Sequence, residues 1–389
     1  MRNQFLLKVL KFLSALLVVV VAAALRIYAA QTLIVNPDEP AYLDAALEYA
    51  NYMREEKWTW LAWSQNNFEH PAFNKIVYGV VLLTQDPIDS FYKKDLPRGA
   101  PIQTAEAKPW AMACRYTSVS FGVIAVAVLA VINPLAGLFL AIQTYSITYT
   151  SLIYLEALPL LTSLLSAIFY LRWMEVNPFK SWMWLSLSAL MLGMTAASKY
   201  LYCVVGIAIS VHFCWISLRQ KLFARRVRWM VAWAILSILA FFFLDPYLWP
   251  HPIDRLVQSI TYLGQYTSSH IVAYYHFPVW QPLKWISTPY SEFFPNTRSS
   301  FLIGWDTWIA LLALIGIPRL FWRQSLFFIW LICGMIILLA WPTKWPQYVL
   351  IMMVPFCIST AEAVIWIINL LCKGWNFFLA RFFSHPNQR

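Results

Sequence analysis

The chain has 389 residues, of which 60% are hydrophobic and only 12% are charged. This composition excludes an ordinary soluble globular protein and indicates a polytopic membrane protein, because soluble domains carry about 25% charged residues. The net charge of +11 does not indicate nucleic-acid binding, because many of the basic residues concentrate in short loops between apolar segments.

Apolar runs that reach or approach the length of a membrane span recur along the whole chain. Roughly 20 apolar residues cross a bilayer, and the runs predict about ten membrane helices in one all-α domain over 1–389. The predicted spans are 9–30, 110–132, 134–151, 157–173, 182–198, 200–218, 229–245, 301–318, 325–341 and 348–371. The first run could be the apolar part of a cleaved signal peptide, but its length and the spans that follow favour an uncleaved anchor.

Basic residues predict how the chain is oriented in the membrane. The short loops on one side hold many Lys and Arg, with Glu175 as their one acid, whereas nearly all other acids lie in segments 31–109 and 246–300. Because Lys and Arg mark cytoplasmic loops, both termini are predicted to be cytoplasmic and both long segments extracytoplasmic. Long loops are usually functional, so we expect the chemistry on the extracytoplasmic side.

The first long segment begins with two adjacent carboxylates, Asp38 and Glu39. Apolar residues then recur at helical spacing over 40–56, which predicts an amphipathic helix lying along the outer surface. A second short apolar helix is expected over 72–84, directly after His70. The acidic pair is therefore predicted at a helix N-terminus close to the outer end of the first span.

This order of features resembles the GT-C superfamily of membrane glycosyltransferases. The similarity is to the glycosyltransferase family 39-like branch, which contains protein O-mannosyltransferases and the lipid A aminoarabinose transferase. In that branch the first outer loop carries Asp-Glu, matched here by Asp38 and Glu39. It also carries His-Pro-Pro, matched only as His70-Pro71-Ala72.

Other short segments match the family's order at the predicted outer ends of helices. They are Arg115, residues 154–157 with Glu156, residues 193–200 with Lys199 and Tyr200, and residues 344–348 with Lys344 and Tyr348. Their common order and outer placement support the resemblance more than any one segment does.

The resemblance implies an enzyme that transfers a sugar, with inversion, from a polyprenyl-phosphate carrier to an acceptor outside the membrane. Asp38 is then the predicted general base, and Glu39 orients the acceptor or raises the proton affinity of Asp38 by like-charge repulsion. Cations must stabilise the leaving phosphate, and the predicted donor-phosphate ligands are Lys199, Lys344 and Arg115.

Four further residues complete the predicted site as substrate-binding or second acidic positions: Glu156, His70, Tyr200 and Tyr348. Carboxylate oxygens are ligands for divalent cations, so a metal held by Asp38 and Glu156 is left open.

Simple structural roles stay open for the same residues. Asp38 and Glu39 precede a predicted helix and could cap it, and Glu156 could do the same at the start of the fourth span. Lys199 and Lys344 could anchor helix ends by extending their ammonium groups to the lipid headgroups.

A polytopic lipid or glycan transporter or flippase without transferase activity is the competing function. Such carriers favour inverted repeats and ionisable sites near the midplane. No repeat is evident here, and the acids lie outside the membrane except Glu362, which we interpret as a helix-packing partner. We expect a small glycan or lipid-linked acceptor, because only loops remain to hold it, and a plasma-membrane location in a bacterium or archaeon.

Overall fold

The computed structural model describes residues 2–88, 95–175, 182–301 and 303–383. Within these ranges the chain is helical, and its one β feature is an isolated bridge between Ile34 and Pro101. The helices of the predicted spans are α1 (Arg2–Thr32), α4 (Lys108–Ile132), α5 (Pro134–Ile142), α6 (Thr144–Tyr149), α7 (Ala157–Glu175), α8 (Trp182–Ser198), α9 (Val204–Arg219), α10 (Phe223–Leu244), α15 (Asp306–Arg323), α16 (Ser325–Ala340) and α17 (Met353–Phe383).

Two long connecting segments separate parts of this bundle, and we call 31–109 the first long loop and 246–300 the second long loop. Their α-helices are α2 (Glu39–Arg54), α3 (Phe73–Leu82), α11 (Pro252–Tyr266), α12 (His270–Tyr275), α13 (Gln281–Ser287) and α14 (Tyr290–Phe293). The predicted amphipathic helix over 40–56 is α2, and the predicted short helix over 72–84 is α3. The chain also contains the 3-10 helices η1 (Trp58–Ala62), η3 (Tyr200–Cys203) and η6 (Pro346–Met352).

Within the described ranges, six helical segments are long and apolar enough to cross a membrane by length and composition. They are Val9–Thr32, Lys108–Ile132, Ala157–Glu175, Tyr200–Arg219, Phe223–Leu244 and Pro346–Lys373. The predicted spans 182–198 and 325–341 are the shorter apolar helices α8 and α16. The chain is thus an all-α polytopic membrane protein, with fewer full-length spanning helices than the ten that the apolar runs predict.

The predicted span 134–151 is not one helix, because it breaks at Gln143 into α5 and α6. Arg26 of α1 is fully buried beside this break. Its guanidinium donates to the carbonyl oxygens of Leu140 at 3.1 Å and Ala141 at 3.2 Å, and to the hydroxyl of Ser146 at 3.0 Å. Helix ends leave carbonyls without intrahelical partners, so Arg26 satisfies groups that a continuous helix would have satisfied itself.

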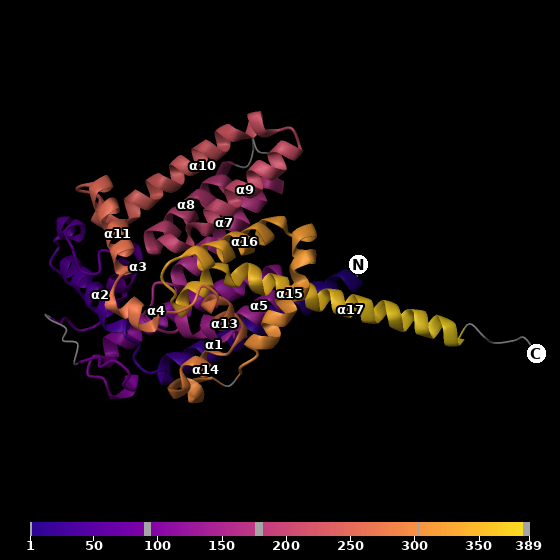
Figure 1. Ribbon diagram of the computed structural model, residues 1–389, viewed down its shortest axis with the longest axis horizontal. Helices are drawn as coiled ribbons and strands as arrows, with labels where there is room; N and C mark the ends of the chain where they lie inside the picture. The colour runs from indigo at the N-terminus through magenta and orange to yellow at the C-terminus, as the bar shows by residue number, and fades with distance from the viewer. Residues whose placement is uncertain (1, 89–94, 176–181, 302, 384–389) are drawn as a thin grey trace, which may run out of the picture.

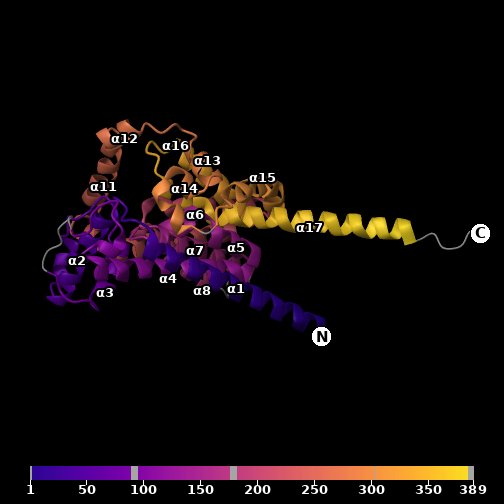
Figure 2. The same ribbon diagram turned by 90° about the horizontal axis from the view of Figure 1, so that it is seen from below.

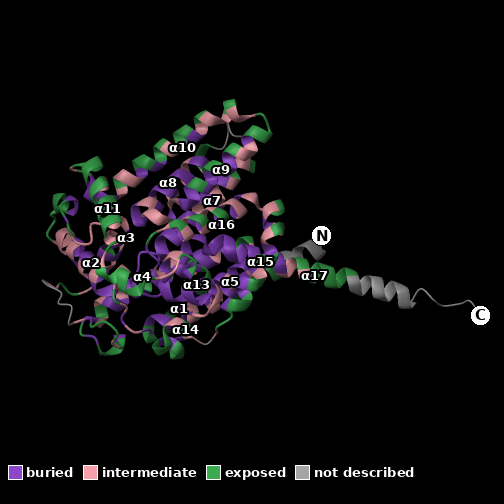
Figure 3. Cartoon of the chain, viewed as in Figure 1, coloured by how far each residue is buried: buried purple, intermediate pink, exposed green. Residues whose placement is uncertain are grey.

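The helices differ in how deeply they lie in the bundle. In the most apolar window of each span, 67% of residues are buried in α7 and 72% in Pro346–Lys373, but only 22% in α10 and 28% in α1. Exposed residues accordingly run along α10 in Figure 3. Exposed apolar faces of this size would be unfavourable in water, which fits α1 and α10 as lipid-facing helices around α7 and α17.

The two chain ends extend from the same side of the molecule. Figure 1 and Figure 2 show the N-terminal part of α1 and the C-terminal half of α17 projecting away from the body, with α2, α3 and α11 at the opposite end. Parts of both long loops, namely α2 and α3 of the first and α11 of the second, therefore lie at the end of the bundle opposite the chain ends.

Small residues allow the helices to approach closely. A Cβ at Gly316 of α15 would overlap the carbonyl oxygen of Ser359 on α17. The Ser359 hydroxyl donates to the carbonyl oxygen of Ala313 at 2.7 Å across the same crossing. Such contacts drive helix association where lipid surrounds the protein.

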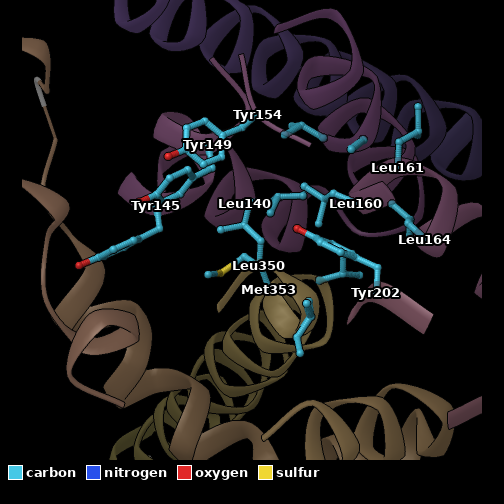
Figure 4. Packing of buried hydrophobic residues seen from close by; sticks show 14 of the residues in the cluster. Leu140, Tyr145, Tyr149, Tyr154, Leu160, Leu161, Leu164, Tyr202, Leu350 and Met353 are labelled. Atoms are coloured by element: carbon cyan, nitrogen blue, oxygen red, sulfur yellow. The ribbon is translucent and has the colours of Figure 1, made fainter. Parts of the chain in front are cut away.

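Apolar side chains from distant segments form the core next to the long loops. Figure 4 shows Leu140, Leu160 and Leu350 meeting from α5, α7 and η6, with Tyr149 and Tyr154 above them. All five side chains are at most 2% exposed.

The last span carries an ion pair. Glu362 of α17 accepts from the Arg319 guanidinium of α15 at 3.1 Å and from the Gln324 amide at 3.0 Å. The predicted role of Glu362 as a helix-packing partner is therefore confirmed, and its charge is compensated where an isolated carboxylate would be costly.

Candidate active site

Asp38 lies at the turn between α1 and α2, at the N-cap position, but its side chain makes no capping hydrogen bond. Its Oδ2 atom instead lies 2.9 Å from the hydroxyl of Tyr154, which also hydrogen-bonds to Asn36. The capping alternative therefore fails for this carboxylate. Asp38 is half-buried, which leaves it able to meet a substrate.

Burial raises the pKa of Asp38, and the hydrogen bond from Tyr154 and the positive charges of Lys199 and Arg98 oppose that rise. The Glu39 carboxylate raises the pKa slightly further, in the direction the sequence predicts. A general base is most effective when its pKa lies nearer to the working pH than that of a free aspartate.

Glu39 faces away from Asp38 into a buried ion pair with Arg115 of α4. The Arg115 Nε and Nη2 atoms donate to the two carboxylate oxygens at 2.8 and 2.6 Å, and both side chains are fully buried. The main-chain N–H groups of Asn36 and Ile153 also donate to this carboxylate, at 2.8 and 2.9 Å. Glu39 is thus held by both the turn that carries Asp38 and the segment that carries Tyr154.

Arg115 does not reach the bundle surface where a lipid phosphate would lie. Its remaining N–H groups donate to the carbonyl oxygens of Ala30, Leu33 and Ile34 at 2.7 to 3.3 Å, at and just beyond the end of α1. All five guanidinium donors have partners. In the structure the partners of Arg115 are therefore Glu39 and main-chain carbonyl groups, whereas the sequence predicts a donor phosphate.

Glu156 and Lys199 form a second buried ion pair, at the start of α7 and the end of α8. Burial raises the pKa of Glu156, and the Lys199 ammonium opposes this. The Lys199 ammonium also lies 5.4 Å from the ring centre of Tyr348. Lys199 is only 4% exposed, so it does not extend to the headgroups as an anchoring lysine would.

His70 joins this group through tilted and edge-on ring contacts. Its ring centre is 5.9 Å from that of Tyr42, which in turn lies 5.6 Å from that of Tyr154. Burial and the nearby charges of Lys199 and Lys75 lower the pKa of His70 well below its usual value. His70 is therefore a neutral imidazole at neutral pH.

Lys344 and Tyr200 lie outside this group. The Lys344 ammonium donates to the carbonyl oxygens of Leu338, Leu339 and Trp341, so it caps the C-terminal end of α16. The Tyr200 ring packs against Phe241 of α10. The structure thus gathers Asp38, Glu156, Lys199, His70 and Tyr348, with Glu39 and Arg115 directly behind Asp38.

Sequence reasoning assigned no role to Tyr42, Tyr154 or Asn36. Tyr154 lies two residues before Glu156 in a segment that is buried throughout. The signal that could have found it is an aromatic residue beside a candidate acid at an outer helix end.

The carboxylates do not form an evident metal site. Among residues 2–88, 95–175, 182–301 and 303–383, no group of three or more His, Cys, Asp or Glu side chains is placed to hold a metal ion. Glu156 is engaged by Lys199 and Glu39 by Arg115. Of the carboxylates Asp38, Glu39 and Glu156, two are therefore already paired with cationic side chains.

The helical arrangement and the residue cluster beside the long loops define a polytopic all-α membrane protein. The chain matches no protein-family model and no curated protein sequence. It is similar in structure to ArnT from Cupriavidus metallidurans, solved bound to undecaprenyl phosphate, with a TM-score of 0.59 and 15% sequence identity. The match covers 96% of this chain and 66% of ArnT, so the chain spans about two thirds of that neighbour.

Proposed function

We propose that this protein is a membrane glycosyltransferase that moves a sugar from a polyprenyl-phosphate carrier to an acceptor on the outer side of the membrane. The observation that carries the proposal is a half-buried carboxylate, Asp38, gathered with the Glu156–Lys199 pair at the loop end of a GT-C-like bundle. The neighbour ArnT is described as bound to undecaprenyl phosphate, which supports a lipid-phosphate donor.

Asp38 acts as the general base. It takes the proton of the acceptor hydroxyl while the oxygen forms a bond to the anomeric carbon, and the bond from that carbon to the phosphate oxygen breaks. The electron pair of the broken bond leaves with the polyprenyl phosphate, and attack from the opposite face inverts the anomeric centre. The raised pKa of Asp38 suits it to this proton transfer.

Lys199 stabilises the leaving phosphate. Its ammonium has one carboxylate partner, Glu156, and lies over the ring of Tyr348. An ammonium has three donors, so Lys199 can bind a phosphate oxygen while it keeps Glu156. The neutral imidazole of His70 and the hydroxyl of Tyr348 serve as polar groups for the substrate.

The proposed acceptor is a small glycan or lipid-linked molecule that the two long loops hold beside Asp38. With both ends of the chain on one side and the long loops on the other, the basic short loops favour cytoplasmic termini and an extracytoplasmic site. The branch of protein O-mannosyltransferase-like and aminoarabinose transferase-like enzymes fits these features, in cell-envelope glycosylation at a bacterial or archaeal plasma membrane.

The test uses the full chain in lipid nanodiscs with a panel of polyprenyl-phosphate hexoses and pentoses. Sugar release to candidate acceptors is compared for the wild type, Asp38→Asn and the matched control Asp86→Asn, which alters an exposed carboxylate of the same loop. Loss of at least about a hundredfold is expected for Asp38→Asn alone. Equal release by Asp38→Asn would reject the base assignment, and lipid transport without any transfer product would favour a flippase.

A further inference from the structure

The turn that carries His70, residues 66–72, is held from one side by a buried lysine. Lys75 of α3 is 1% exposed. Its ammonium donates to the carbonyl oxygens of Asn67 at 2.7 Å, His70 at 2.9 Å and Asn66 at 3.3 Å. Lysine is almost never fully buried unless it is paired, and here its direct partners are backbone carbonyls.

A buried carboxylate holds the other end of the same turn. Asp245, at the end of α10, is fully buried, and its Oδ1 atom accepts from the main-chain N–H of Ala72 at 3.1 Å. The charges of Asp245 and Lys75 attract each other. One turn thus has a cation on its carbonyl groups and an anion on its N–H group, with the anion supplied by a distant segment.

The second long loop also contacts this turn. The hydroxyl of Ser259 on α11 donates to the carbonyl oxygen of Phe68 at 3.0 Å. Asn67 has a φ of 56°, a left-handed conformation that asparagine adopts more readily than most residues. The second long loop therefore supports the first.

We propose that Asp245 and Lys75 are positioning residues that hold the His70 turn, and so keep the His70 ring against Tyr42 in the candidate site. The positioning of His70 by these two residues does not depend on the proposed function. Only the use that the enzyme makes of His70 rests on it. Removal of either charge weakens the electrostatic compensation of the other buried charge and frees one end of the turn.

The contact to Ala72 can be removed without changing a charge. It uses a main-chain N–H, which proline lacks. Ala72 has a φ of −79°, which proline can adopt. Ala72→Pro therefore removes the hydrogen bond to Asp245 while it leaves both charges in place.

The test follows the reaction of His70 with diethylpyrocarbonate by peptide mass spectrometry, using the full chain in nanodiscs over a range of pH. The variants are Asp245→Asn, Lys75→Met and Ala72→Pro. The matched controls are Asp254→Asn and Lys284→Met, which change exposed charges of the second long loop. The exposed His251 is the internal standard.

We expect His70 to react about five- to tenfold faster in Asp245→Asn and Ala72→Pro, because the turn opens when its hydrogen bond is lost. Lys75 and Lys199 are the cations that lower the pKa of His70, so Lys75→Met should also shift the midpoint of the reaction to higher pH. Both controls should match the wild type.

Wild-type rates and midpoints for His70 in folded Asp245→Asn, Lys75→Met and Ala72→Pro would overturn the proposal. If the charge variants do not fold, Ala72→Pro alone decides, because it introduces no unpaired charge. An acceleration of His251 equal to that of His70 would indicate general unfolding and would also count against positioning. No sugar donor is used, so failure of the proposed transferase activity would leave this result unaffected.

Discussion

Two buried carboxylate–cation pairs flank Asp38, and they differ in how fully their polar atoms are used. In the Glu39–Arg115 pair both oxygens and all five guanidinium donors have partners within the protein. In the Glu156–Lys199 pair one oxygen, Oε2 of Glu156, is buried without a partner in the described part of the chain.

A fully satisfied pair has no group left for a substrate, so the contacts of Glu39 and Arg115 favour a structural role that fixes the backbone carrying Asp38. A partly satisfied pair in a low-dielectric site can still bind a ligand and respond to its charge. Under the proposed function, the Glu156–Lys199 pair therefore has the chemical role.

The largest effect on stability is expected from Arg115→Met. It leaves the buried Glu39 carboxylate with only the main-chain N–H groups of Asn36 and Ile153 as donors, and removes the donor to three carbonyl groups at the end of α1. Loss of the cation from this buried pair should cost about 3–5 kcal/mol. Thermal unfolding in nanodiscs measures the loss, with Arg172→Met, which removes an exposed arginine, as control. A stable Arg115→Met protein that has lost only donor binding would restore the predicted phosphate-binding role.

Lys199→Met should have the opposite effect, a small loss of stability and a large loss of activity. Glu156 can become neutral, since burial already raises its pKa, so we expect little loss of stability. Sugar transfer should fall about a hundred- to a thousandfold, the usual effect of removing one group that stabilises developing charge. Transfer rates and unfolding are measured on the same samples, and full activity would remove Lys199 from the mechanism.

The pH profile of transfer should distinguish Asp38 from both pairs. Asp38 must be ionised to act as a base, so activity should fall as the pH drops through its raised pKa. Tyr154→Phe removes the hydrogen bond that lowers this pKa. The acid limb should therefore move to higher pH.

The control for this profile is Tyr116→Phe, an exposed tyrosine on α4 whose hydroxyl accepts from Gln31. Its acid limb should coincide with that of the wild type. A Tyr154→Phe limb at lower pH would contradict the assignment, because it would mean that the hydroxyl destabilises the charged form of Asp38.

Sequence predicted the helices more reliably than it predicted side-chain partners. Apolar length predicted the helices, and Asp38, Glu156 and Lys199, which the sequence places at outer helix ends, lie near one another in the structure. The direction in which a side chain points within a bundle depends on three-dimensional packing, so the pairing of Arg115 could not be predicted. The break between α5 and α6 was missed because Arg26 looks like an isolated charge in the first span.

Lys344 gives the smallest expected effect and the sharpest contrast with Lys199, since sequence predicted the same role for both. Its ammonium caps carbonyl groups of α16, whereas that of Lys199 meets a carboxylate and an aromatic ring. Lys344→Met should lower stability by about 1 kcal/mol and leave the KM for the lipid-phosphate donor within about twofold of the wild type. A donor KM raised tenfold or more, with unfolding unchanged, would mean that Lys344 leaves the helix end and binds the phosphate during turnover.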